Sequence, residues 1–134
     1  MCGIAGYFGL RELPDAQIDN CLREMRRRGP DHQASHHTRT PSNRNVYLLH
    51  SRLSIIDLSW NGNQPICHDD IVLAYNGEIY NYRELRKTLN NGGVNFLTHS
   101  DTEVVLEAYK KWGEECVGRL DGMFAFAIVD SEKK

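Results

Sequence analysis

The sequence contains no long apolar run, no C-x-x-C pair and no large excess of charge of one sign. No apolar stretch approaches the roughly 20 residues that a membrane-spanning helix requires. The net charge is -2, so the composition does not favour a polyanion or an anionic membrane as a partner. The first residues also lack the basic start and apolar core of a signal peptide. We therefore expect a cytoplasmic protein with neither a nucleic-acid nor a membrane partner.

Only four cysteines occur, and their spacing does not indicate a disulfide framework. Cys21 falls on a predicted apolar helix face and is expected to be a small buried residue, as is Cys116. One alternative is a small metal-binding protein that uses the neighbours Cys67 and His68 with His36 and His37. Adjacent strand residues point to opposite faces, so such doublets make poor chelates, and we expect no metal.

With 134 residues, 40% of them hydrophobic, the chain is long enough for one domain with a real core. Apolar runs predict strands at 4–8, 46–49, 71–75 and 123–129, and residues 51–58 are a weaker strand candidate. The run 123–129 is apolar throughout, which predicts a strand buried on both faces.

Three helices are also predicted. Apolar residues at 18, 21, 22 and 25 follow the i, i+3, i+4, i+7 pattern, and Gly29-Pro30 ends that helix. Asn81 with Glu84, and Ser100 with Glu103, resemble capping boxes that open two further helices. Strands mixed with amphipathic helices indicate α and β structure layered around an interior sheet.

Cys2 is chemically unusual because it follows the initiator methionine. Removal of Met1 would leave Cys2 with a free α-amine, so that one residue carries both a thiol and a base. Free α-amines and thiols have similar ordinary pKa values, about 8 and about 8.5. If Met1 stays, that nitrogen is an amide and offers no base. The plain alternative is that Cys2 merely begins a buried strand.

The residues after Cys2 favour the catalytic interpretation. The opening Cys2-Gly3-Ile4-Ala5-Gly6 resembles that of class II glutamine amidotransferases, which are N-terminal nucleophile hydrolases. Further matching segments occur in family order, at 28–31, 50–57, 64–65, 75–81, 100–103 and 121–126. Within the class, the chain is most similar to the glutaminase domain of glutamine-hydrolysing asparagine synthetase. The resemblance implies an α+β fold, a four-layer αββα sandwich of the N-terminal nucleophile hydrolase type.

The same resemblance implies the chemistry. Cys2 would attack the side-chain amide of L-glutamine and form a γ-glutamyl thioester, which water would hydrolyse to glutamate after ammonia has left. The side chain of Asn76 and the backbone N–H of Gly77 would stabilise the oxyanion. Asn-Gly is also a strong hairpin signal, but a loop running into a helix is expected here rather than a second strand.

Substrate contacts follow from the same motifs. Arg52 would hold the substrate α-carboxylate in a two-pronged pair, and Asp101 would pair with the α-ammonium group. Asp101 also suits a helix N-terminus, and both roles can hold together. Glu78 is a weaker candidate for a contact with the substrate amine. Arg28 and Asp31 are interpreted as a structural ion pair. The pocket lining is predicted to include Leu53, Ser54, Ile55 and Ile56.

The family's domain usually continues beyond the strand at 123–129, so we interpret 1–134 as the N-terminal portion of a type 2 glutamine amidotransferase domain, C-terminally truncated. The remaining strands and the synthetase domain would be missing. ATP and magnesium are expected only in that synthetase domain, and no cofactor in this one. Expected partners are L-glutamine and the synthetase domain, and homodimer formation stays open. The alternative function is an inactive glutamine-sensing or assembly module with the same fold.

Overall fold

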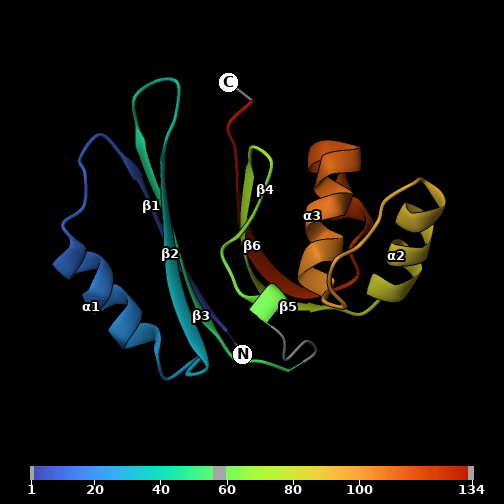
Figure 1. Cartoon of the computed structure of the whole chain (residues 1–134), viewed down its shortest axis with the longest axis horizontal. Helices are drawn as coiled ribbons and strands as arrows, with labels where there is room; N and C mark the ends of the chain where they lie inside the picture. Colours follow the sequence, from blue (N-terminus) through green and yellow to red (C-terminus); the bar gives the residue numbers. More distant parts are fainter. Residues whose placement is uncertain (1, 56–59, 133–134) are drawn as a thin grey trace. The chain divides into compact units, whose positions relative to one another are not determined.

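The computed structural model describes residues 2–55 and 60–132 and contains two three-stranded sheets with helices (Figure 1). The sheet orders are β1-β3-β2 and β4-β5-β6. No helix in the described ranges is long and apolar enough to cross a membrane. The elements are β1 (Gly3–Gly9), α1 (Asp15–Met25), β2 (His32–Arg39), β3 (Asn45–Arg52), a 3-10 turn (Trp60–Gly62), β4 (Ile66–His68), β5 (Ile71–Ile79), α2 (Tyr82–Asn91), α3 (Asp101–Trp112), a second 3-10 helix (Gly113–Arg119) and β6 (Gly122–Asp130).

The chain forms two compact units. The first comprises Met1–Ser54, Asn63–Asn76 and Ala125–Lys134, and the second comprises Ile55–Gly62 and Gly77–Phe124. The first therefore holds the β1-β3-β2 sheet, α1, β4 and the first part of β5. The second holds α2, α3 and the last residues of β5.

In the first unit, β3 is the central strand of its sheet and pairs antiparallel with β1 and β2 on its two sides. Every residue of β3 is buried. Leu48 of β3 packs with Val72 and Ala74 of β5, and Ile4 of β1 adds to this cluster. The two sheets thus meet through apolar side chains, which confirms a layered core. Helix α1 lies beside the β1-β3-β2 sheet (Figure 1). Its predicted apolar face is the face that is covered, because the only partly buried residues of α1 are Ile18, Cys21, Leu22 and Met25.

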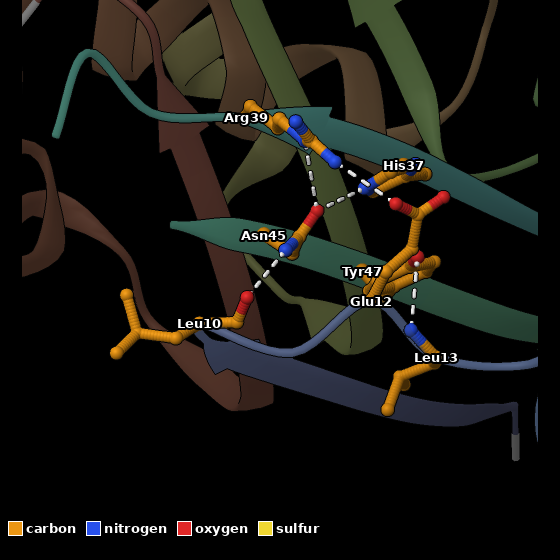
Figure 2. A network of polar contacts seen from close by, with 7 residues as sticks. All are labelled: Leu10, Glu12, Leu13, His37, Arg39, Asn45 and Tyr47. Atoms are coloured by element: carbon orange, nitrogen blue, oxygen red, sulfur yellow. Dashed lines mark hydrogen bonds and ion pairs between the residues drawn. The ribbon is translucent and has the colours of Figure 1, made fainter. Parts of the chain in front are cut away.

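A buried amide joins the end of this sheet to the segment before α1. The Oδ1 atom of Asn45 accepts hydrogen bonds from His37 Nε2 at 2.9 Å and Arg39 Nε at 3.1 Å, while its Nδ2 donates to Leu10 O at 3.1 Å. Figure 2 shows Asn45 at the centre of these contacts. Asn45 is 3% exposed, so this network fixes backbone where water does not compete.

In the second unit, α2 and α3 lie side by side (Figure 1). The predicted cap of α3 is confirmed, because Ser100 accepts a hydrogen bond from the backbone N–H of Glu103. The capping box at Asn81 is wrong. Its side chain instead bonds to Arg119 O at 2.9 Å and the N–H of Asp121 at 3.1 Å, so it ties down the segment before β6.

Three other expectations need correction. Strand β2 was not predicted, since its residues His32–Arg39 contain no apolar alternation and only its backbone pairing with β3 defines it. The strand candidate at 51–58 is wrong for 53–55: β3 ends at Arg52, and 56–59 lie outside the described residues. Strand β6 is not buried on both faces. It ends its sheet, with β5 as its neighbour, and Met123 is 67% exposed.

Candidate active site

Cys2 lies just before β1 and contacts the backbone of Leu53. The N–H of Leu53 donates to Cys2 Sγ at 3.3 Å, and Sγ is 3.6 Å from Leu53 O. This contact follows from strand register, because Gly3 pairs with Ser51 and so brings Cys2 to the end of β3. Cys2 is half-buried, which leaves part of the residue open to a ligand.

Two polar residues hold the backbone around this contact. Arg28 Nε donates to Cys2 O at 3.1 Å, and Asp31 Oδ2 accepts from the N–H of Ser54 at 2.7 Å. The interpretation of Arg28 and Asp31 as an ion pair with each other is therefore replaced by two separate contacts. Each has a better partner within reach, and both support the backbone on either side of the Cys2–Leu53 contact.

Arg52 is the last residue of β3 and is 6% exposed, so its guanidinium is not a surface charge. Its Nη1 donates to Asn63 Oδ1 at 2.7 Å. Burial of a guanidinium is costly unless polar partners surround it. A buried guanidinium in the residue directly before Leu53 is suited to receive a carboxylate.

The residues predicted to line the pocket divide between the units. Leu53 and Ser54 are half-buried in the first unit, and both contribute backbone contacts. Ile55 belongs to the second unit and is 69% exposed. Ile56 lies outside the described residues.

Asn76 and Gly77 lie inside β5, which excludes a hairpin turn at Asn-Gly and also corrects the expected loop, since the strand runs on to Ile79. The Oδ1 atom of Asn76 is buried and has no hydrogen-bond partner among the described residues. Such a polar group is uncommon in native structures, and a bound ligand is one way to satisfy it. At Gly77, an added Cβ would lie 2.4 Å from Met123 O, so close approach of β6 itself requires glycine there.

Sequence reasoning assigned no role to two buried polar residues that hold the residue before Asn76. His50 Nε2 lies 3.0 Å from Tyr75 O, and Gln64 Oε1 accepts from the N–H of Tyr75 at 2.6 Å. His50 is fully buried and Gln64 is 5% exposed. The available signal was a histidine that directly follows the apolar run Val46–Leu49, where a polar residue needs a partner.

Burial also controls the charge of His50. Desolvation lowers its pKa from 6.5 to about 4; the hydrogen bond to the Tyr75 carbonyl acts in the opposite direction, and Arg52 and His32 lower the pKa by smaller amounts. His50 is therefore neutral at physiological pH and donates through Nε2–H, because the carbonyl of Tyr75 can only accept.

This pKa predicts loss of stability in mild acid. Between pH 6.5 and 4 the unfolded chain binds a proton at His50 that the folded protein does not, so the free energy of unfolding falls as pH falls. We expect His50 alone to account for about 3 kcal/mol by pH 4. Urea unfolding at pH 7 and pH 4.5 would measure this, with His50→Gln as the matched variant. A pH dependence that is unchanged in His50→Gln would contradict the assignment.

Asp101 and Glu78 belong to the second unit. Asp101 is 5% exposed and its Oδ2 accepts from the N–H of Ile79 at 3.2 Å, so it joins the start of α3 to the end of β5. Glu103 supports this region, since it accepts hydrogen bonds from Leu97 N and from both Thr98 N and Oγ1. Glu78 is exposed. Asp101 thus lies in the first turn of α3 and links it to β5, while its substrate role stays a prediction.

The residues considered for a metal are only partly brought together. Cys67 Sγ lies 3.4 Å from His36 Nδ1. His37 instead stacks on Tyr47 at 4.1 Å, and His68 is paired with Asp69 at 3.1 Å. In the ranges the structure describes, no three histidine, cysteine or acidic side chains gather as a metal site.

Known proteins similar to this chain include asparagine synthetases and a phosphoribosylpyrophosphate amidotransferase. The chain is 39% identical to "Asparagine synthetase [glutamine-hydrolyzing] 2" of Oryza sativa subsp. japonica, over 100% of this chain and 22% of that protein. It is 37% identical to "Putative asparagine synthetase [glutamine-hydrolyzing] 2" of Methanocaldococcus jannaschii, over 99% and 28% respectively. The chain thus spans less than a third of the length of these relatives.

A solved structure of glutamine phosphoribosylpyrophosphate amidotransferase from B. subtilis matches with a TM-score of 0.75 and 21% identity, over 96% of this chain and 35% of that one. This likeness confirms the predicted α+β fold of the N-terminal nucleophile hydrolase type. The family model described as "Glutamine amidotransferase domain" matches residues 1–134, and the chain therefore belongs to that family.

Proposed function

We propose that the protein hydrolyses L-glutamine to glutamate and ammonia, with Cys2 as the nucleophile once Met1 has been removed. The observation that carries the proposal is the contact of Cys2 Sγ with the backbone of Leu53, directly after the buried Arg52. The Cys2 thiol contacts Leu53, and the buried cation Arg52 is the residue directly before Leu53. Glutamine offers its side-chain amide to such a thiol and its α-carboxylate to such a cation.

In the proposed reaction, the Cys2 thiol gives its proton to its own α-amine as sulfur bonds to the amide carbon of glutamine. The side chain of Asn76 and the N–H of Gly77 stabilise the oxyanion that forms. The α-ammonium of Cys2 then passes its proton to the amide nitrogen of the substrate, the carbon–nitrogen bond breaks, and that nitrogen leaves as ammonia. Water adds to the γ-glutamyl thioester, its proton returns to sulfur, and glutamate is released.

The destination of the ammonia is also part of the proposal. The similar proteins are named glutamine-hydrolysing asparagine synthetases, and the chain covers only 22% of the plant protein. We infer that ammonia passes to an ATP-dependent synthetase domain that forms an amide, with aspartate as the first acceptor to test. No cofactor is assigned to residues 1–134 in this scheme.

Intact mass measured before and after treatment with diazo-oxo-norleucine tests the proposal directly. This glutamine analogue alkylates a thiol that is activated next to a glutamine site. We expect a mass without Met1 and a single adduct, which peptide mapping places on Cys2. Absence of turnover and of the adduct in protein that has lost Met1 would contradict the proposed function, and would favour a sensing or assembly module.

Arg52→Lys is expected to weaken glutamine binding more than it slows chemistry. Lysine keeps the charge but cannot form two parallel hydrogen bonds with a carboxylate. We therefore expect KM for glutamine to rise by roughly tenfold with little change in kcat. Arg39→Lys, in which the exposed pair with Glu12 at 2.9 Å is altered, serves as the control and should leave KM unchanged. A lower kcat at unchanged KM would assign Arg52 to the chemical step instead.

A further inference from the structure

His50 and Gln64 hold both hydrogen-bonding groups of a single backbone residue, Tyr75. Strand β4 pairs with β5 from Ile66 opposite Leu73, so continuation of the ladder would place residue 64 opposite Tyr75. The strand begins only at Ile66, after Pro65, which has no N–H to offer. Beyond the end of the backbone ladder, two side chains therefore supply the partners that a neighbouring strand would supply.

This clamp, formed by His50 and Gln64 on Tyr75, is well protected from water. Tyr75 is 2% exposed, His50 is fully buried, and Gln64 is 5% exposed. The two contacts, 3.0 Å to the carbonyl and 2.6 Å to the N–H, restrain the backbone on both sides of the Tyr75 Cα atom. The carbonyl of Tyr75 belongs to the planar peptide group that joins Tyr75 to Asn76. The clamp therefore also restrains the backbone N and Cα atoms of Asn76.

Restraint of the backbone at Tyr75 matters because Asn76, the next residue, carries the proposed oxyanion donor. Its Oδ1 atom is buried and has no partner in the described part of the chain. The protein therefore holds this amide mainly through the backbone rather than through side-chain contacts to Oδ1. A donor that stabilises an oxyanion must be in place before the charge forms, and a small displacement weakens it greatly.

We propose that His50 and Gln64 are positioning residues for the oxyanion: through the backbone of Tyr75 they set the placement of Asn76 and of the Gly77 N–H that follows it. The inference rests on the proposed glutaminase function and assigns to it two residues that bond to the backbone of Tyr75 rather than to the Cys2 thiol. The competing explanation is that both side chains only stabilise the end of β5.

Substitutions that remove or keep one hydrogen bond at a time distinguish these explanations. In protein from which Met1 has been removed, Gln64→Met removes the acceptor at similar size, whereas Gln64→Glu keeps an acceptor oxygen. His50→Phe removes the donor, whereas His50→Gln keeps one. For the two removing variants we expect kcat to fall by roughly 10 to 10²-fold with KM for glutamine nearly unchanged, and the two keeping variants should recover most of the loss.

A double-mutant cycle then tests whether the effect passes through Asn76. In an Asn76→Ala background, Gln64→Met should lower kcat little further, because the group it positions is already gone. Asn45→Ala is the matched control, since it removes a buried amide at the other end of β3 and should lower stability without the kcat effect (Figure 2). If His50→Phe does not fold, Gln64→Asn tests the clamp instead, because it withdraws the amide by one methylene group. The same two results are expected: a loss of kcat at nearly unchanged KM, and little further loss in the Asn76→Ala background.

The outcomes separate cleanly. A wild-type protein without turnover overturns the proposed function, and this inference with it. Turnover in the wild type, combined with a loss for Gln64→Met that is as large in the Asn76→Ala background as with Asn76 intact, overturns the clamp alone. A rise in KM without loss of kcat overturns it as well.

Discussion

Cys2→Ala is expected to abolish glutamine hydrolysis, with a loss of at least about 10⁴-fold in kcat, the range seen when an enzyme loses its nucleophile. The variant should still fold, because it loses only the contact of Leu53 with the Cys2 sulfur. The hydrogen bond from Arg28 to the backbone carbonyl of residue 2 remains. A coupled assay for glutamate, with ammonia measured in parallel, gives the rate. Protein that retains Met1 should be equally inactive, since its Cys2 nitrogen is an amide.

Cys67→Ser is the matched control for this experiment. Cys67 lies on β4 and is exposed, but desolvation raises the pKa of its thiol and so lowers the thiolate fraction at neutral pH. Its replacement should leave both turnover and labelling by the glutamine analogue unchanged. Substantial turnover in Cys2→Ala, or an adduct that moves to Cys67, would remove Cys2 from the centre of the mechanism.

The fold was predictable where local apolar patterns decide the structure. The face of α1, the cap at Ser100 and the strand that begins at Ile71 are all visible in the sequence, since each depends on residues close together in the chain. Strand β2 is different: its residues are polar, and it exists because β3 offers a partner along its whole length. The burial of 123–129 was overestimated for a related reason, because apolar composition does not say how much of a strand its neighbours cover.

The site was predictable as a set of residues but not as a set of contacts. The motifs selected Cys2, Arg52 and Asn76, yet the contact between Cys2 and the backbone of Leu53 comes from the pairing of β1 with β3. The hydrogen bonds of His50 and Gln64 to Tyr75 span 25 and 11 residues, so nothing in the sequence near Tyr75 announces them. Long-range register decides such contacts.

Asn76→Ala is expected to lower kcat by roughly 10²-fold or more, the usual loss when one side-chain donor to an oxyanion is removed. KM should change little, because the oxyanion exists in the transition state and not in bound glutamine. The packing cost should be small, since Oδ1 has no hydrogen-bond partner among the described residues, and thermal unfolding of the variant would check this.

Asn76→Asp sharpens the same prediction. It preserves the shape of the side chain, but an ionised carboxylate offers no donor and repels the negative charge that forms on the substrate oxygen. We therefore expect kcat to fall further in Asn76→Asp than in Asn76→Ala, although Asp is the closer match in size. The opposite ranking would mean that shape matters more than hydrogen-bond donation at this position.

Gly77→Ala is no substitute for this test, because the added Cβ would lie 2.4 Å from Met123 O and disturb β5 and β6 directly. The order of the two Asn76 variants thus reports on charge at the reacting oxygen, separately from packing.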